Sequence, residues 1–259
     1  MIIRNRTLYM LITLSGVATA AAAQESAPDS LTIGAGAQYA PRYSGDNRHT
    51  LTVVPVMQAR HGAFFFNTEK GLGYDLQSDS GVYIEQSLGV SPGRADKDSD
   101  WRDGADSLKG MGSIKTALNT GLALGWAVTP WLVAEGKATL PLTDSQGVQY
   151  QTSLTLLPFQ DAADTVAFQT AALFGDSRYM NTFYGVSPRQ SARSGYGRYA
   201  AHGGFYGVSN SLIWSHQFSE HWGTTLSAGY TWLGDNAADS PIVRQRNQTS
   251  AAVAVTYTF

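Results

Sequence analysis

Serine and histidine stand close together at two places, Ser215–His216 and Ser219–His221, and such pairs could serve a hydrolase. A serine nucleophile needs a histidine base within hydrogen-bond reach, and a third group that orients the base. Successive side chains of a strand point to opposite faces, so Ser215 would face away from His216. Ser219 and His221 fall in a predicted turn between strands, and the chain contains no cysteine. These residues predict a protein without a catalytic site, a metal or a cofactor.

A second group of candidate residues is a run of aspartates interleaved with basic residues in the segment 91–113. The aspartates are Asp96, Asp98, Asp100, Asp103 and Asp106. Carboxylate oxygens suit a divalent cation, but this spacing is not that of an EF-hand loop. The mixed charge favours a solvated loop between two strands.

Four further charged residues lie on predicted strands, on the face that otherwise carries small and polar side chains. They are Glu85, Lys115, Glu135 and Lys137. If that face lines a barrel, the four charges could pair with one another, because buried charges need partners. Alternatively, they form a ring that selects a small solute by its charge. Eight strands fill their interior and sixteen leave a channel, so an intermediate barrel permits both interpretations.

Arginine and tyrosine are frequent in residues 175–202. They are Arg178, Arg189, Arg193, Arg198, Tyr179, Tyr184, Tyr196 and Tyr199. We expect this segment to fold into the barrel mouth as a plug, because so long a connection is usually ordered for a reason. Its tyrosines would pack there, and its arginines would pair with Asp235 and Asp239. The alternative is an exposed loop whose arginines bind lipopolysaccharide phosphates, which suit guanidinium geometry.

Apolar and polar residues alternate along the segments that carry these side chains, which is the period of two expected of β-strands. Within 222–232, one face carries Trp222, Leu226, Ala228, Tyr230 and Trp232, and the other carries glycine, serine and threonine. Residues 250–259 alternate in the same way and end in Tyr257 and Phe259. A strand that faced water would carry lysine and glutamate on its polar face. Small polar residues inside and apolar residues outside are typical of a membrane barrel. We therefore predict an all-β fold, a transmembrane antiparallel β-barrel.

Loop lengths predict twelve strands in an up-and-down meander. We place them near 31–39, 51–60, 62–66, 71–77, 81–90, 114–127, 131–141, 147–157, 164–174, 203–217, 221–233 and 248–259. All long connections then lie on one side, as in bacterial barrels with short periplasmic turns and long external loops. The count depends on 62–77, where three consecutive phenylalanines break the alternation. Ten strands is the alternative.

Residues 1–23 have the pattern of a signal peptide. Arg4 and Arg6 precede a short apolar core, and Ala21–Ala23 supply the small residues of a cleavage site. We expect export across the inner membrane, which leaves 24–259 as an outer-membrane barrel of a Gram-negative bacterium. The chain has 18 lysines and arginines against 20 aspartates and glutamates, so no basic excess favours nucleic-acid binding.

Three segments, 34–45, 183–199 and 234–243, together resemble the MipA/OmpV family of Gram-negative outer-membrane proteins. The residues that carry the pattern are Tyr184, Gly185, Ser191, Arg193, Ser194, Gly195 and Tyr199, then Asp239, Ser240 and Pro241, and finally Tyr257 and Phe259 of the last strand. The resemblance extends over essentially the whole mature chain. It brings no catalytic residues with it.

The resemblance implies a function that the residues alone do not show. The family is named for interaction with a membrane-bound lytic transglycosylase of murein, and members are described as scaffolds for murein hydrolases and synthases. We expect a structural anchor of this kind, surrounded by outer-membrane lipid and lipopolysaccharide. Its C-terminal strand would engage the barrel-assembly machinery. A narrow diffusion channel for small solutes is the alternative, because short periplasmic turns offer a scaffold little surface.

Overall fold

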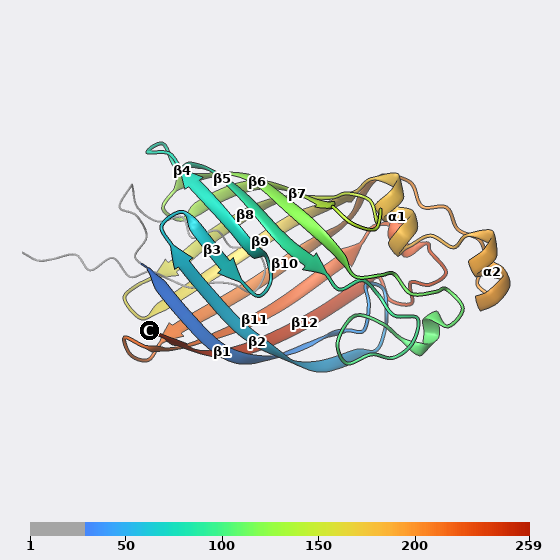
Figure 1. Ribbon diagram of the computed structural model, residues 1–259, viewed down its shortest axis with the longest axis horizontal. Helices are drawn as coiled ribbons and strands as arrows, with labels where there is room; N and C mark the ends of the chain where they lie inside the picture. The colour runs from blue at the N-terminus through green and yellow to red at the C-terminus, as the bar shows by residue number, and fades with distance from the viewer. Residues whose placement is uncertain (1–28) are drawn as a thin grey trace, which may run out of the picture.

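Twelve antiparallel strands form a closed barrel in the computed structural model, which describes residues 29–259. Each strand pairs with its neighbours in chain order, and β1 closes the ring on β12 (Figure 1). The predicted twelve-stranded meander is confirmed, and the ten-stranded alternative is wrong. The predicted signal peptide, residues 1–23, lies outside the described residues.

The strands are β1 (Ser30–Pro41), β2 (His49–His61), β3 (Phe64–Asn67), β4 (Gly71–Gln77), β5 (Val82–Ser91), β6 (Ala117–Thr129), β7 (Leu132–Pro141), β8 (Gln149–Gln160), β9 (Asp164–Gly175), β10 (Gly204–Gln217), β11 (Trp222–Leu233) and β12 (Asn247–Thr258). The long connections contain a 3-10 turn, η1 (Asp106–Leu108), and the helices α1 (Ser177–Phe183), α2 (Pro188–Ser194) and α3 (Asp235–Ala238). None of these helices is long and apolar enough to cross a membrane.

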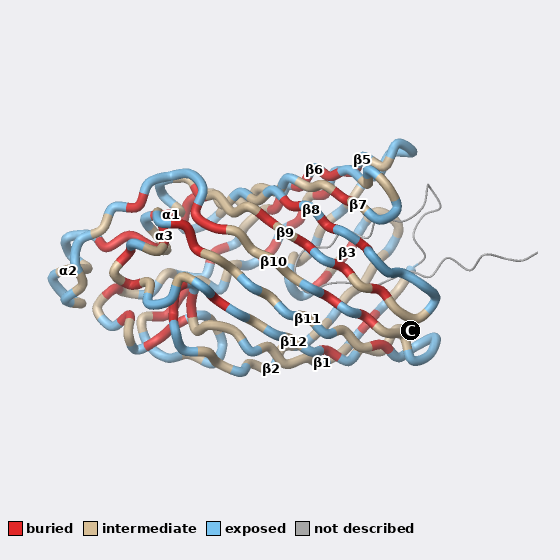
Figure 2. The backbone as a smooth tube through the Cα atoms, turned by 180° about the vertical axis from the view of Figure 1, so that it is seen from behind, coloured by how far each residue is buried: buried red, intermediate tan, exposed pale blue. Residues whose placement is uncertain are grey.

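Alternation along the strands decides which face meets lipid. On β5, Val82, Ile84 and Leu88 are exposed, whereas Tyr83 and Glu85 between them are buried. Figure 2 shows such alternation of exposed and buried positions along β5 and other strands. Because the exposed residues are apolar, the outer face suits hydrocarbon, and the inner face keeps the polar side chains.

The β3–β4 hairpin is the irregular part of the wall. β2 has 13 residues and β5 has 10, but β3 has only four and β4 seven. The phenylalanine run belongs to β3, where Phe65 faces inward and lies between two cations. Its ring centroid is 5.7 Å from the Arg60 guanidinium carbon and 5.9 Å from Lys70 Nζ. This inward ring is why the simple alternation fails at β3.

The largest fully buried side chains lie mostly outside the barrel, in the long connections at one end. We call these connections the cap: residues 42–48, 92–116, 142–148, 176–203 and 234–246. Figure 1 shows them extending together from one end of the barrel, with α2 farthest from the strands. The buried residues of the cap include Tyr43, Leu108, Met180, Tyr184 and Ile242. The apolar core of this protein is therefore largely a core of the cap.

Candidate functional site

Two ion pairs line the barrel interior on the side of the short hairpin. Arg60 of β2 donates to both carboxylate oxygens of Asp75 on β4, at 2.9 and 2.5 Å. Lys70, in the β3–β4 turn, donates to both oxygens of Glu85 on β5, at 2.9 and 2.6 Å. Glu85 is only 8% exposed. Short bidentate contacts of this kind satisfy charges that have lost much of their water.

A third lumenal carboxylate bonds to a phenol rather than to a cation. The Tyr83 hydroxyl donates to Glu135 Oε2 at 2.6 Å, which joins β5 to β7. The Tyr83 ring lies flat against Gly125 of β6, where a Cβ would fall 2.1 Å from the ring carbon Cζ. Only glycine leaves room for the ring at this position.

The four predicted lumenal charges are only partly brought together. Glu85 and Glu135 face the lumen, and Lys137 lies beside Gly121 in the inner wall, its Cε 3.7 Å from where a Cβ would stand. Lys115 does not face the lumen, and its predicted placement on a strand is wrong. β6 begins at Ala117, and Lys115 is an exposed cap residue whose carbonyl accepts a hydrogen bond from Gln146 Nε2. The Lys115 carbonyl therefore bonds to another cap loop and not to a neighbouring strand.

Sequence reasoning missed Arg60, Lys70, Asp75 and Tyr83. Lys70 lies in a turn, which no period assigns to a face. Asp75 and Tyr83 do follow the alternation of β4 and β5, and that signal would have placed both inside. The opposite wall, from β8 to β12 and on β1, has no charged residue at its inward positions. The lumen is therefore charged on one side only.

The cap is built by loops that arise on opposite sides of the barrel. Leu108 and Met111 of the β5–β6 connection share one buried cluster with Tyr43, Val186 and Ile242. Ile242 belongs to the β11–β12 connection, which lies across the ring because six strands separate the two connections. Loops from opposite sides can share a core only by crossing the mouth. The cap therefore extends over the mouth.

The family-pattern residues connect the loops of the cap. Ser240 donates from Oγ to the Tyr184 carbonyl at 2.5 Å, and both residues are 2% exposed. The Tyr184 hydroxyl shares a 2.8 Å hydrogen bond with Ser44 Oγ, and the Tyr43 hydroxyl donates to the Ile242 carbonyl at 2.7 Å. Burial holds the pKa of Tyr184 well above its ordinary value. Three connections distant in sequence are thus joined around one tyrosine.

Other pattern residues shape α2. Ser187 and Gln190 form a capping box at its start, and Gly195 ends it in the left-handed conformation, φ 79°. Ser191 donates to the Tyr196 carbonyl and Ser194 to the Gln190 carbonyl, both at 2.7 Å. Asp239, Pro241, Gly185 and Tyr199 lie in the same loops, and the Tyr199 hydroxyl donates to the Asn236 carbonyl at 3.0 Å. The pattern thus specifies loop structure.

The predicted ion pairs of the loop arginines are wrong. Arg246, next to β12, contacts Asp235 at 2.6 Å and Asp239 at 3.8 Å. Arg178, Arg189, Arg193 and Arg198 are exposed, and none forms an ion pair within residues 29–259. The buried arginine of the cap is one the sequence did not single out.

That residue is Arg94, which is 4% exposed. Its Nη1 donates to the Phe183 carbonyl at 2.6 Å, and its guanidinium carbon lies 5.8 Å from the Tyr43 ring centroid. Burial lowers the pKa of Arg94 below the ordinary arginine value. Arg94 ties the β5–β6 connection to the end of α1.

Comparison with known proteins identifies this architecture. The family model described as MltA-interacting protein MipA matches residues 33–259. The chain belongs to the MipA family. Outer membrane protein OmpV of Vibrio cholerae is 27% identical over 204 residues, which cover 77% of this chain and 75% of OmpV. Outer membrane protein Omp26La of Vibrio anguillarum is 28% identical over 161 residues, 61% of this chain and 60% of that protein.

A solved outer membrane channel from Pseudomonas putida F1 has a similar fold. It superposes with a TM-score of 0.55 at 9% identity, and the match covers 95% of the MipA-family chain and all of that chain. At this identity the likeness concerns the fold alone. The MipA-family barrel is an outer-membrane protein of a Gram-negative bacterium, and its cap is the external end, because long connections are external in such barrels.

The serine–histidine pairs of this MipA-family protein are held apart. Ser215 shares a 3.1 Å hydrogen bond with Thr225, whereas His216 Nδ1 lies 2.9 Å from Asp164. Ser219 Oγ accepts from the backbone N–H of His221 at 3.3 Å, while the His221 ring contacts the Thr258 carbonyl. No serine hydroxyl of these pairs meets a histidine ring.

One motif that the sequence reading overlooked is a Gly-x-Ser-x-Gly spacing at residues 89–93. Its Ser91 ends β5 and accepts a hydrogen bond from Asn119 Nδ2 at 2.8 Å. A nucleophile elbow places its serine on a strand-to-helix turn, and no helix follows β5 directly. The spacing at residues 89–93 therefore lacks the context that the motif requires.

The aspartates of the MipA-family cap do not gather around a metal position. Within residues 29–259 no group of three or more acidic or histidine side chains could hold an ion. Asp98 instead accepts the Asp106 N–H at 2.8 Å and lies 3.2 Å from Arg48 and 3.7 Å from Arg42. The backbone bond, and then the two arginines, lower the pKa of Asp98 below the ordinary 3.8. Asp98 therefore joins two cap loops.

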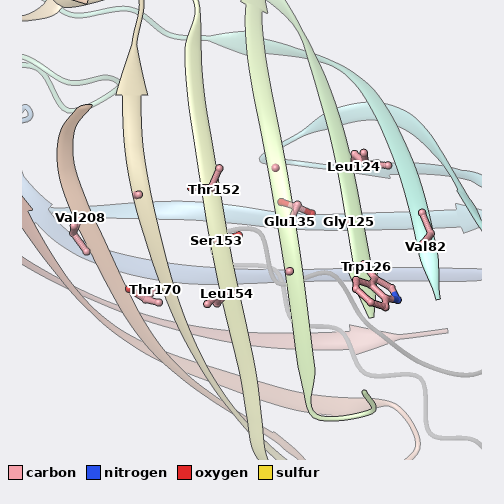
Figure 3. Close-up of a pocket in the computed structure, with 13 residues that line it drawn as sticks. Val82, Leu124, Gly125, Trp126, Glu135, Thr152, Ser153, Leu154, Thr170 and Val208 are labelled. Carbon is pink, nitrogen blue, oxygen red and sulfur yellow. The ribbon is translucent and has the colours of Figure 1, made fainter. Parts of the chain in front are cut away.

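A hollow of about 660 Å³ lies on the wall across β5 to β10 (Figure 3). Most of its lining residues point away from the lumen, among them Leu124, Trp126 and Leu154, which are exposed. Glu135 and Ser153 reach it from the inner face. The hollow therefore belongs mainly to the lipid-facing surface.

Proposed function

We propose that this MipA-family barrel is a narrow channel for small polar solutes. The observation that carries the proposal is the composition of the inner wall. Opposite a band of charged side chains it bears mainly glycine, serine, threonine and glutamine, together with a small apolar cluster of Leu157, Ala167 and Ile213. Ion pairs removed from water are expensive, and a purely structural barrel could hold apolar side chains there instead. A polar inner wall is favourable when water fills the lumen.

The charges of the lumen nearly cancel, which sets the expected selectivity. Arg60, Lys70 and Lys137 face Asp75, Glu85 and Glu135. Glu135 bonds to the Tyr83 phenol and not to a cation, so its charge acts most directly on passing ions. Neutralising Glu135 leaves a net positive wall, and neutralising Lys137 leaves a net negative one.

Single-channel conductance of the refolded mature protein in a planar bilayer tests the channel. Stable steps are expected, with a shift toward anions in Glu135→Gln and toward cations in Lys137→Gln. Asp79→Asn is the matched control, because it removes one charge from an exposed turn outside the lumen. A folded barrel without conductance steps would overturn the channel proposal.

A second candidate, the murein scaffold, is favoured by the family description, which names an MltA-interacting protein. Within residues 29–259, only short turns and the ends of β1 and β12 face the periplasm, so a transglycosylase would have to contact these. Capture of murein lytic transglycosylase or synthase from an envelope extract at low salt tests this candidate. Recovery of neither enzyme would count against the scaffold without affecting the channel.

A further inference from the structure

The wall of the barrel is incompletely paired beside the short hairpin. β2 pairs with β3 only from Gln58 to His61, although β2 begins at His49. On the other side, β4 pairs with β5 only as far as Leu88. Figure 1 shows the β3–β4 hairpin ending part-way along these two longer strands. We call the stretch beyond its tip the wall interruption.

Hydrogen-bond parity shows which backbone groups point into the wall interruption. The N–H of Met57 donates to Thr68 Oγ1 at 2.8 Å, and its carbonyl accepts the Thr68 N–H at 3.1 Å. Backbone groups two residues apart in a strand point the same way. The groups of Pro55, Val53 and Leu51 therefore point away from β1 and toward the missing strand. No hydrogen bond satisfies them on that side within residues 29–259.

The wall interruption has a defined frame. The hairpin tip, 68–70, forms its lower border and is tied to β5 by Lys70 and Glu85. Above it, the β5–β6 connection crosses to the β1–β2 loop, where the Gly104 N–H donates to the Arg42 carbonyl at 2.7 Å and Asp98 meets Arg48. The interruption therefore lies between the hairpin tip and the cap, and we call it the window.

The window faces the outer leaflet of the membrane. On its outer rim, Leu51 is 69% and Val53 75% exposed, and Val90 of β5 is 57% exposed. Leu51 stands opposite Tyr39, an exposed ring near the external end of β1. On the inner rim, Val54 and Val56 face the lumen beside Gly36 and Gly34. The outer rim is thus apolar, whereas the inner rim also carries Thr52 of β2 and Ser91 of β5, and the lower border carries the Lys70–Glu85 pair.

Unpaired backbone groups cannot remain bare in hydrocarbon, where each costs several kcal/mol. We infer that the window admits single-chain amphiphiles, so that a polar head bonds to the edge of β2 and reaches the lumen while the apolar tail stays in the outer leaflet. The inference rests on the hydrated lumen of the proposed channel. It extends that proposal by naming a substrate class and a route through the wall.

An added strand from a second copy would be another way to cover the edge, and Pro55 argues against it. Proline has no N–H, so an incoming strand would lose a ladder bond in the middle of a short edge. Proline at an open edge is a device by which proteins discourage strand addition. A small amphiphilic ligand needs no continuous ladder and fits the edge as it stands.

Cysteine labelling tests the window directly, because the chain has no cysteine of its own. Val54→Cys places a thiol at the inner rim. Ala254→Cys is the control, since Ala254 pairs with Gly36, which pairs with Val54, and therefore lies two strands away on the same line of paired residues, in a fully paired part of the wall. The probes are N-dodecylmaleimide, itself a single-chain amphiphile, and a small water-soluble maleimide.

We expect dodecylmaleimide to label Val54→Cys at least about tenfold faster than Ala254→Cys, because a closed wall keeps polar heads out of hydrocarbon. Ala254 is 4% exposed and Val54 is half-buried, so each dodecylmaleimide rate is divided by the rate of the water-soluble reagent at the same thiol. Equal dodecylmaleimide rates at the two thiols after this division would overturn the window and leave the channel intact. If the water-soluble reagent labels neither thiol, the hydrated lumen itself fails.

A second pair of variants keeps the inference testable from the other direction. Lengthening the β3–β4 hairpin until β3 pairs with β2 as far as Leu51 should close the window and abolish the dodecylmaleimide preference for Val54→Cys. Ion conductance through the lumen should remain. An unchanged preference would refute the window as the route. Disulfide dimers formed by Val53→Cys in membranes would show a second copy on the edge and would also refute it.

Discussion

The ion pair between Lys70 and Glu85 should hold the hairpin tip in the wall, and its removal is the sharpest test of the lumenal network. The two groups approach to 2.6 Å, with side-chain exposures of 13% and 11%. At an effective dielectric constant near 20, this separation corresponds to a gross attraction of about 6 kcal/mol. Much of that attraction offsets the loss of hydration. Removing one partner from a buried pair nonetheless costs about 3–5 kcal/mol, because it leaves a buried charge uncompensated.

We expect Lys70→Met to lower the free energy of unfolding by about 3 kcal/mol, at the lower end because the lumen is hydrated. Glu85→Met should cost a similar amount. The double variant should lie within about 1 kcal/mol of the parent, because replacing both partners by apolar groups is often neutral. Urea unfolding of the refolded barrel, followed by its heat-modifiable mobility, measures all four proteins of the cycle.

The exposed pair Arg246–Asp235 in the cap is the control for this cycle. Its side chains are 38% and 76% exposed, so Asp235→Asn should change stability by less than about 1 kcal/mol. If the two single variants at Lys70 and Glu85 simply add in the double variant, the pair does not act as a unit. That result would refute the claim that Lys70 and Glu85 stabilise the lumenal wall as a pair.

Four further predictions concern the cap and the wall. Deleting 186–198 should raise single-channel conductance if the connection 176–203 obstructs the mouth, and unchanged conductance would contradict a plug. The contacts of the Asp98 carboxylate stabilise the cap above the ordinary pKa of 3.8, and they are lost as the pH falls through the lowered pKa of Asp98. Acid should therefore expose the cap to proteolysis, and Asp98→Asn should do so at neutral pH. Gly125→Ala should displace Tyr83 and cost about 1–3 kcal/mol from overpacking, measured by urea unfolding, whereas a neutral result would mean that the ring has another position. Finally, Arg193→Gln should weaken binding to lipopolysaccharide vesicles at low salt if the exposed loop arginines meet its phosphates, and equal binding would exclude that role.

Much of the fold could be predicted from the sequence because the strands follow one simple rule. Inward and outward residues alternate, so the aromatic residues Tyr257 and Phe259 identify the outward face of the last strand. This alternation holds only where the chain is hydrogen-bonded between neighbouring strands, and the prediction failed where the chain leaves a strand. Lys115 continues the pattern of a strand in sequence, but β6 begins only at Ala117, and the Lys115 carbonyl bonds to Gln146 of the cap.

The cap could not be derived in this way, since its contacts join residues that no period relates. Ser240 and Tyr184 were singled out by the family resemblance, but the bond between them depends on two loops meeting. The arginines were misjudged for a similar reason. Charge alone suggested the arginines of 175–202 as partners for Asp235 and Asp239, whereas Arg246 follows the same connection and contacts both aspartates.

The cap and the window suggest a division of routes that experiment can separate. Loops from opposite sides share a core over the mouth, so a solute that moves along the barrel axis must displace the contacts around Tyr184. A solute that enters between β2 and β5 passes beneath the cap and displaces nothing there. Loss of residues 186–198 should therefore change the axial route alone, and a longer β3–β4 hairpin should change the lateral route alone. Because the two changes affect different strands and different loops, the effects of both in one protein should combine independently.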